Sequence, residues 1–183
     1  MFHPDTQFLI DRWSELARSR DVRGGVPARE RFTPESLGAR LPRAFLLQGA
    51  GAEARLRLAG GWLEALHGRP LAGRAFLDLW CEASPVLVAP AVSQAVREGR
   101  PVVIVAQLGP RPTPVEVVVA PLRGRDGQAD LLLGLVAPAG EAGLGRDESR
   151  QLAARVTIGV GNVGRPDLRL VSRGVSPAAA SAR

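Results

Sequence analysis

The chain contains no lysine and no tyrosine, and it has a single asparagine among its 183 residues. All 24 basic residues are therefore arginines, and isoleucine is rare beside leucine, valine and alanine. Lysine, tyrosine, asparagine and isoleucine all use AT-rich codons, so this pattern indicates a GC-rich genome. The formal net charge of +6 is for that reason weak evidence for a nucleic-acid partner.

Cysteine, aromatic residues and long apolar runs are also scarce. Cys81 is the only cysteine, which excludes a disulfide within the chain and favours a reducing, cytoplasmic location. No apolar run approaches the about 20 residues of a membrane-spanning helix, and the first residues lack the pattern of a signal peptide. Aromatic residues make up 4% of the chain against 45% hydrophobic residues, so we expect a core of leucine, valine and alanine.

Motifs for catalysis or metal binding are missing as well. His3, His67 and Cys81 are too far apart to predict a zinc site, and no nucleophile elbow, P-loop or HExxH pattern occurs. The glycines of residues 159–164 lack the strand–helix frame of a dinucleotide site. The carboxylates show no evident dyad. We therefore predict that the chain is not an enzyme and holds no metal.

The chain divides into three parts. Residues 1–29 are predicted to form an amphipathic helix over 3–19 and a polar connector, residues 30–138 a folded domain, and residues 139–183 a Gly/Ala/Arg-rich extension that is partly disordered. The expected strands of the domain are 45–47, 55–58, 102–108, 115–122 and 129–137. Short helices are expected over 62–66 and 75–81, and a longer helix over 85–99 with a kink or a split at Pro90.

The C-terminal extension carries most of the positive balance. From Leu144 to Arg183 there are seven arginines against three acidic residues, a net charge of +4. Residues 145–156 are expected to form a further helix, and residues 172–183 to be disordered. The simplest interpretation is a solvated tail. The alternative is a weak electrostatic attachment to nucleic acid, anionic lipid or an acidic protein.

The order of elements defines the fold class. Two strands, several short helices and three further strands predict an α+β domain in which one antiparallel sheet carries the short helices on one face. The segment RLRLAGGWLEALHGRPLAGRAFLDLW, residues 55–80, holds two of the three tryptophans and four glycines that break it at three places. Those glycines are expected to form tight turns between the short helices.

This segment resembles the core of a bacterial family of small, standalone PAS-like proteins. The resemblance lies in the strand end Arg57–Gly60, a short helix, the turn Gly68–Gly73 and the aromatic-ended helix Phe76–Trp80, and it covers about residues 30–138. It implies a five-stranded antiparallel sheet with helices inserted after the second strand. It further implies a regulatory or sensory module that binds small ligands between sheet and helices, dimerises through flanking helices and passes signals to partner proteins.

The candidate ligand-binding residues lie on the inserted helices. They are Trp62, Leu66, His67, Phe76 and Trp80, which the same pattern also allows as plain core. His67 resembles the axial haem ligand of some PAS domains, although a helix-terminal histidine more often caps the helix. Cys81 lacks the sequence context of the cysteine that attacks flavin in blue-light PAS domains, so we expect a small buried residue. The cofactor, if one binds, is unknown from the sequence.

Three functional hypotheses follow. The first is a cytoplasmic PAS-like regulator that acts in trans on a signalling protein, forms a homodimer through its N-terminal helix and binds either no ligand or a small apolar one. The second is a sensor with a bound cofactor such as haem. The third is a nucleic-acid or membrane-surface binder that uses the arginine-rich tail.

Overall fold

The computed structural model describes residues 1–19, 25–109, 113–140, 150–161 and 168–173, the last range for its backbone alone. The strands are β1 (Ala44–Gln48), β2 (Arg55–Ala59), β3 (Val102–Leu108), β4 (Thr113–Leu122), β5 (Leu131–Pro138), β6 (Leu152–Val160) and β7 (Leu168–Arg173). The α-helices are α1 (Pro4–Ala17), α2 (Pro34–Leu37), α3 (Gly61–His67) and α4 (Pro85–Glu98). Short 3₁₀ helices are η2 (Arg29–Arg31), η3 (Gly38–Arg43), η4 (Gly51–Glu53) and η5 (Phe76–Leu79).

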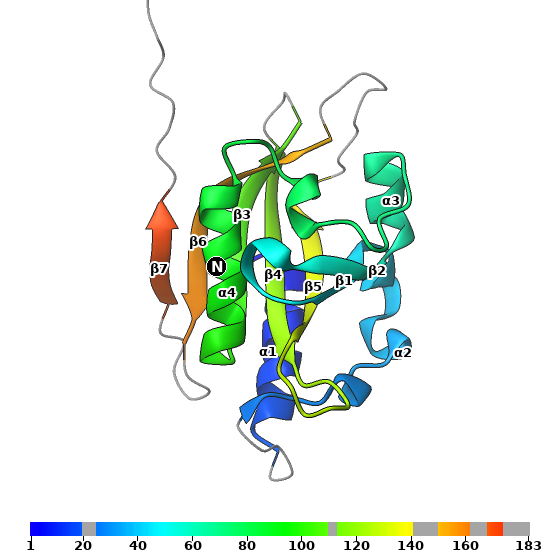
Figure 1. The fold of residues 1–183 in the computed structure, drawn as a ribbon, viewed down its shortest axis with the longest axis vertical. Coiled ribbons are helices and arrows are strands. Elements are labelled where there is room, and N and C mark those ends of the chain that lie inside the picture. Colours follow the sequence, from blue (N-terminus) through cyan, green and yellow to red (C-terminus); the bar gives the residue numbers. More distant parts are fainter. Residues whose placement is uncertain (20–24, 110–112, 141–149, 162–167, 174–183) are drawn as a thin grey trace, which may run out of the picture.

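All strands belong to one antiparallel sheet in the order β2-β1-β5-β4-β3-β6-β7 (Figure 1). The predicted α+β class and the antiparallel sheet with inserted helices are confirmed. The predicted number of five strands is wrong, because two further strands join the sheet beside β3. Without β6, the outer edge of β3 would be left unpaired, and an unpaired edge exposes a row of backbone N–H and C=O groups.

The helix expected over residues 145–156 is also wrong over residues 150–156, and residues 145–149 lie outside the described residues. Residues 152–160 form β6, which pairs with β3 from Val102↔Gly159 to Leu108↔Leu152. Apolar residues at 152, 156 and 160 recur every four positions, which suits a helix, but the adjacent edge of β3 supplies hydrogen-bond partners that only a strand can use. Of the predicted disordered tail, residues 172 and 173 belong to β7, and residues 174–183 lie outside the described residues.

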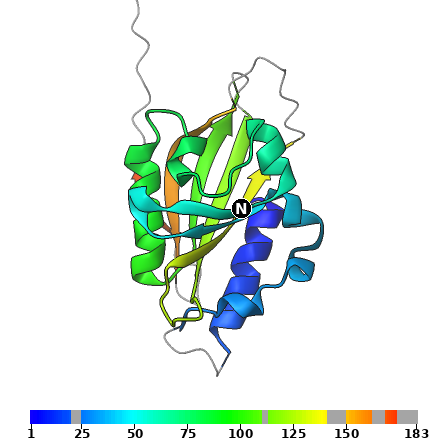
Figure 2. The same cartoon turned by 45° about the vertical axis from the view of Figure 1, so that its right-hand side comes forward.

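Both faces of the central strands are covered (Figures 1 and 2). On one face lie η5 and α4, and on the other lies α1, which contacts β4 and β5. Alternate residues serve the two layers: Ile104 and Val117 face α4, whereas Val103 and Val118 face α1. Strands buried on both sides need apolar residues at successive positions, which explains the apolar run of residues 102–106 in β3.

Helix α1 packs its apolar stripe on its own sheet. Leu9 and Trp13 are buried, and the indole nitrogen of Trp13 donates a 2.7 Å hydrogen bond to the carbonyl of Pro121. The start of α1 is capped by His3, whose ring accepts a hydrogen bond from the backbone N–H of Asp5. The N-terminal helix thus lies on the face of the sheet opposite to η5 and α4.

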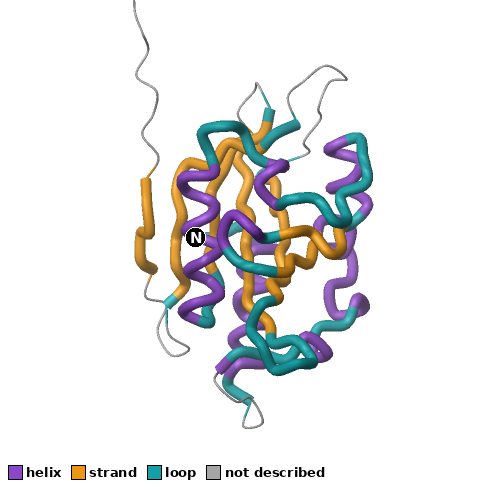
Figure 3. Tube along the Cα trace, viewed as in Figure 1, coloured by secondary structure: helices purple, strands orange, loops and turns teal. Residues whose placement is uncertain are grey.

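Helix α4 runs unbroken through Pro90, so the expected split does not occur (Figure 3). The ring of Pro90 removes the hydrogen bond that the carbonyl of Val86, four residues earlier, would accept. Val86 is 74% exposed, so water can take the place of the missing donor. No helix among the described residues is long and apolar enough to cross a bilayer.

Candidate functional site

The five predicted ligand residues lie together in the layer formed by α3, η5 and α4, which we call the cap. Leu66, Phe76 and Trp80 are buried in one apolar cluster between the cap and the sheet, and Trp62 is half-buried against it. His67 ends α3. The structure thus brings the aromatic and leucine positions into one cluster, in which their immediate role is packing.

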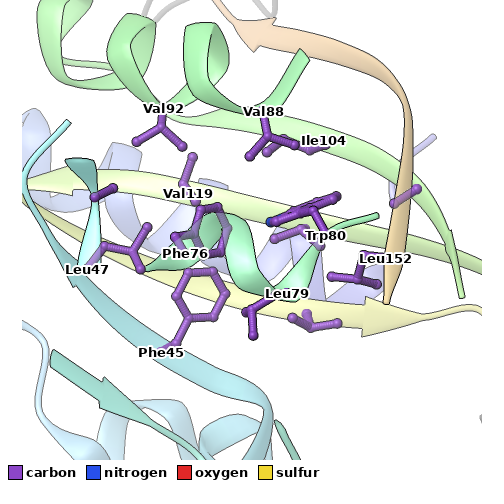
Figure 4. Packing of buried hydrophobic residues seen from close by; sticks show 14 of the residues in the cluster. Phe45, Leu47, Phe76, Leu79, Trp80, Val88, Val92, Ile104, Val119 and Leu152 are labelled. Carbon is purple, nitrogen blue, oxygen red and sulfur yellow. The ribbon is translucent and has the colours of Figure 1, made fainter. Parts of the chain in front are cut away.

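Stacked aromatic rings fill the centre of this cluster (Figure 4). The rings of Phe45 and Phe76 stack with centroids 5.3 Å apart, and Phe76 meets Trp80 edge-on at 5.7 Å. Figure 4 shows Val88 and Val92 of α4 closing over these rings. Offset and edge-on contacts of this kind are favourable aromatic geometries. The packing thus occupies the space between sheet and cap where the sequence predicted a ligand.

A glycine on β5 makes this packing possible. Gly134 lies directly opposite Phe45 across the β1–β5 pair, on the cap side of the sheet. A Cβ atom added at Gly134 would lie 2.0 Å from Cζ of Phe45, so any larger residue collides with the ring. A glycine inside a strand is typical of such a close approach.

The histidine of the cap is uncharged near neutral pH. Burial, followed by the nearby charges of Arg69 and Arg150, lowers the pKa of His67 to about 4. The structure places Gly68, in the left-handed conformation, at the C-cap of α3, so the cap that a helix-terminal histidine often provides is not formed by His67. Two buried ring nitrogens of the cap, Nε2 of His67 and Nε1 of Trp80, have no hydrogen-bond partner among the described residues.

Ser84, which the sequence did not single out, joins the cap to β6. Its hydroxyl accepts a 2.9 Å hydrogen bond from the backbone N–H of Ala154 and lies 3.1 Å from the sulfur of Cys81. The backbone N–H of Cys81 also donates to the carbonyl of Leu152 at 2.8 Å. Cys81 is half-buried beside this serine, and not a fully buried apolar residue as expected. The sequence signal for Ser84 was its position directly before Pro85, at the start of α4. Its contact with β6 could not be predicted, because β6 itself was not predicted.

Two adjoining hollows lie elsewhere, at the β1–β2 end of the sheet. Neither is lined by any of the five predicted residues. The first is an apolar cavity of about 430 Å³, and the second is a polar cavity of about 660 Å³. Both are lined by Arg29, Leu46 and Leu58. We call the two together the β1–β2 groove.

Sequence alternation misplaced one residue of this groove. Residues 55–58 alternate as a half-buried strand would, which predicts Leu56 and Leu58 on the same buried face. An irregularity in the pairing sets Leu46 against Leu58 but Leu47 against Leu56. The extra residue turns Leu58 to the opposite face, where it is 58% exposed.

Comparisons with known proteins agree with this architecture. The family model of the PAS domain matches residues 1–137, so the chain belongs to the PAS domain family. PAS domains are generally sensory modules, and they commonly mediate protein interactions and dimerise. The family assignment therefore supports a sensory or regulatory role.

Among solved structures, a light-oxygen-voltage domain studied with a flavin analogue is similar at 18% identity, with a TM-score of 0.45 over 58% of this chain and 84% of that chain. A LOV protein of Rhodobacter sphaeroides is similar at 19% identity, with a TM-score of 0.43 over 60% of this chain and 68% of that chain. No curated protein matches the chain.

Proposed function

We propose that this chain is a non-catalytic PAS protein that regulates a signalling protein in trans, by direct contact, through a change in the arrangement of its cap. The observation that carries the proposal is the pair of buried, unpartnered ring nitrogens on His67 and Trp80. A buried polar atom without a partner costs about 1–3 kcal/mol. That cost lowers the stability of the present cap packing relative to any arrangement in which these two nitrogens form hydrogen bonds. A partner or ligand can then shift the equilibrium between the two arrangements.

The link at Ser84 gives such a change a route to the rest of the sheet. The Ser84 hydroxyl and the Cys81 backbone hold the start of α4 to β6. A movement of the cap is therefore transmitted to β6, which lies toward the opposite edge of the sheet from β1 and β2. A partner that contacts either end of the sheet is able to sense the position of the cap.

The test has two stages. The tagged full chain is used to capture proteins from a lysate of its source organism, and an enriched signalling protein is then purified and its affinity measured. Trp80→Phe removes the unpartnered N–H while keeping an aromatic ring, and it is expected to change the affinity for the partner. Trp62→Phe, on the half-buried ring, is the matched control. Failure to enrich any signalling protein contradicts action in trans, and equal affinities of the two variants contradict the cap mechanism.

The predicted homodimer remains a proposal. The apolar stripe of α1 is buried on its own sheet, so a dimer formed through this helix would use its exposed side, which includes Gln7, Asp11 and Glu15. Light scattering of the purified chain at several concentrations measures the oligomeric state directly. A strictly monomeric chain at micromolar concentrations would contradict the dimer.

The two other hypotheses keep their own tests. A haem on His67 would need space beside the ring, and His67 lines neither hollow of the β1–β2 groove. An absorption spectrum of freshly purified protein, without a Soret or flavin band, would contradict a bound cofactor. The third hypothesis concerns the arginine-rich tail. One of its arginines, Arg155 of β6, already bonds the side chain of Gln107. Deletion of residues 174–183 tests whether the remaining tail binds an anionic partner in a salt-dependent way.

A further inference from the structure

We propose that the β1–β2 groove binds a small amphipathic anion, with its apolar body in the 430 Å³ cavity and its carboxylate head at Arg29 and Arg57. This site goes beyond the regulatory role proposed above, and it lies outside the cap interior where the sequence predicted a ligand. It does not depend on the identity of any protein partner.

The apolar cavity has the features of a small-molecule pocket. Its volume falls within the roughly 300–1,000 Å³ of such pockets. Leu46 and Leu133 belong to the sheet, and Phe32, Leu37 and Leu41 belong to the segment that faces it. Water in such a cavity finds few polar groups, so an apolar body can displace it favourably.

Exposed leucines gather at the same place. The described residues contain four large hydrophobic side chains that are exposed, and two of them, Leu41 at 42% and Leu58 at 58%, line this one cavity. The backbone irregularity beside Leu46 turns Leu58 toward the cavity and away from the cap cluster. Apolar side chains left exposed around a hollow are typical of a binding surface.

The adjoining polar cavity is lined by three arginines and three carboxylates, and two of these arginines have no carboxylate partner among the described residues. Its three carboxylates already have donors from this chain: Glu30 pairs with Arg125 at 3.4 Å, Asp126 accepts from the backbone of residue 128, and Asp130 accepts from the side chain of residue 48. Arg29 and Arg57 have no carboxylate at ion-pair distance among the described residues.

Arg29 is suited to receive the head of the ligand. It lines both cavities and so stands at their junction. One of its terminal nitrogens donates to the carbonyl of Phe32 at 2.7 Å, which holds the side chain in place. A guanidinium carries five N–H donors in a planar fork that fits a carboxylate, so donors remain for an anion.

The segment that faces the sheet is already fixed in position. Asp5 of α1 holds Arg40 at 2.7 Å and Arg43 at 2.8 Å, one residue beyond each side of Leu41 and Pro42. Gly60 lets the carbonyls of Leu41 and Pro42 approach the start of α3 closely, since an added Cβ would lie 2.4 and 2.3 Å from them. A preformed wall lowers the ordering cost of binding, so a small ligand can bind with useful affinity.

Calorimetric titration of the folded full chain tests the site, with decanoate as the probe below its micelle concentration. We expect decanoate to bind, and decyltrimethylammonium, with the same chain and the opposite charge, to bind at least tenfold more weakly. Arg57→Gln is expected to weaken decanoate about tenfold, as the loss of one charge-assisted contact implies. Arg55→Gln, on the same strand but outside both cavities, is the matched control.

A second pair of variants tests the apolar cavity. Leu58→Gln is expected to weaken decanoate about fivefold or more, because the chain loses an apolar contact. Val86→Gln changes another exposed hydrophobic residue, on α4 and outside both cavities, and is expected to leave affinity unchanged. Both positions are exposed, so neither variant threatens folding.

The titrations show whether the β1–β2 groove binds an amphipathic anion. Absence of decanoate binding, equal binding of the cationic probe, or equal effects of Leu58→Gln and Val86→Gln would overturn the proposal. The other outcome is that a peptide of the captured signalling protein displaces decanoate and binds much more tightly than decanoate does. That result would assign the groove to a protein partner, and it would also overturn the proposal. The capture experiment described above fails or succeeds without reference to this titration, so the two proposals can fail separately.

Discussion

Replacement of Gly134 by alanine tests the packing that fills the cap. The added methyl group would lie 2.0 Å from Cζ, 2.2 Å from Cε2 and 2.6 Å from Cε1 of Phe45. These distances are far below van der Waals contact, so the ring or the strand must move. Phe45 is 2% exposed and stacks on Phe76, which is fully buried. The ring is therefore held against a buried neighbour within the cap cluster.

The magnitude follows from overpacking. A methyl group forced into a well-packed core costs about 1–3 kcal/mol. We expect Gly134→Ala to fall at the upper end, since Phe45 and its stacking partner Phe76 are both buried. Phe45→Leu alone leaves space where the ring was and costs on the order of 1–2 kcal/mol. In the double variant the methyl group enters that space, so its loss of stability should be at least 1 kcal/mol smaller than the sum of the single losses.

Urea unfolding followed by circular dichroism at pH 7 measures all three free energies of unfolding. Gly61→Ala serves as the control, because an added Cβ there has no atom within 4 Å and the residue begins α3. Its effect should be neutral or slightly stabilising. An unchanged free energy for Gly134→Ala, or additive losses in the double variant, would refute the described packing of the cap.

Three further predictions concern the contacts that hold the layers together. Because the pKa of His67 is lowered to about 4, the unfolded chain binds a proton at this side chain at a higher pH than the folded chain does. The free energy of unfolding therefore falls as the pH drops from 6.5 toward 4, and it is unaffected above 6.5. His67→Gln should remove this part of the fall, as measured by urea unfolding. Ser84→Ala should cost about 1–2 kcal/mol and raise the hydrogen-exchange rate of the Ala154 amide, because that N–H loses its acceptor. Asp5→Asn should cost about 1–3 kcal/mol in thermal unfolding, because Arg40 and Arg43 lose a shared and nearly buried carboxylate.

Each of these three has a matched control. For His67 the comparison is His67→Gln, and a pKa near 6.5 for His67 by NMR would contradict its burial. Ser36→Ala changes an outer hydroxyl that bonds a turn carbonyl, and an equal loss there would deny Ser84 a special role. Asp11→Asn alters an exposed carboxylate on α1, and it should leave the unfolding temperature within a degree or two of the unaltered chain.

Much of the fold was predictable because hydrophobic periodicity is local. The spacing of Leu9, Trp13 and Leu16 specified an amphipathic helix, and the apolar runs of β3, β4 and β5 specified buried strands. The glycine-broken segment of residues 55–80 indicated the inserted helices, and it carried the resemblance to PAS proteins. These features depend on residues within a few positions of each other, so the sequence suffices.

Other features were decided by partners distant in the sequence. Residues 152–160 are a strand because the edge of β3 is available to them, a fact that no local pattern contains. Leu58 faces the groove because one irregular step in its pairing with β1 reverses the side on which it lies. Ser84 became important only when β6 was placed beside it.

The candidate site shows the same division. The sequence alone determined which residues form the cap and that Trp62, Leu66, Phe76 and Trp80 gather there, since their spacing places them on neighbouring short helices. Only the tertiary structure decided that these side chains pack against one another and the sheet, and that the open hollows lie at the β1–β2 end. Hydrophobicity specifies that a residue is buried, but the relative placement of distant strands decides whether the buried space is filled or left open.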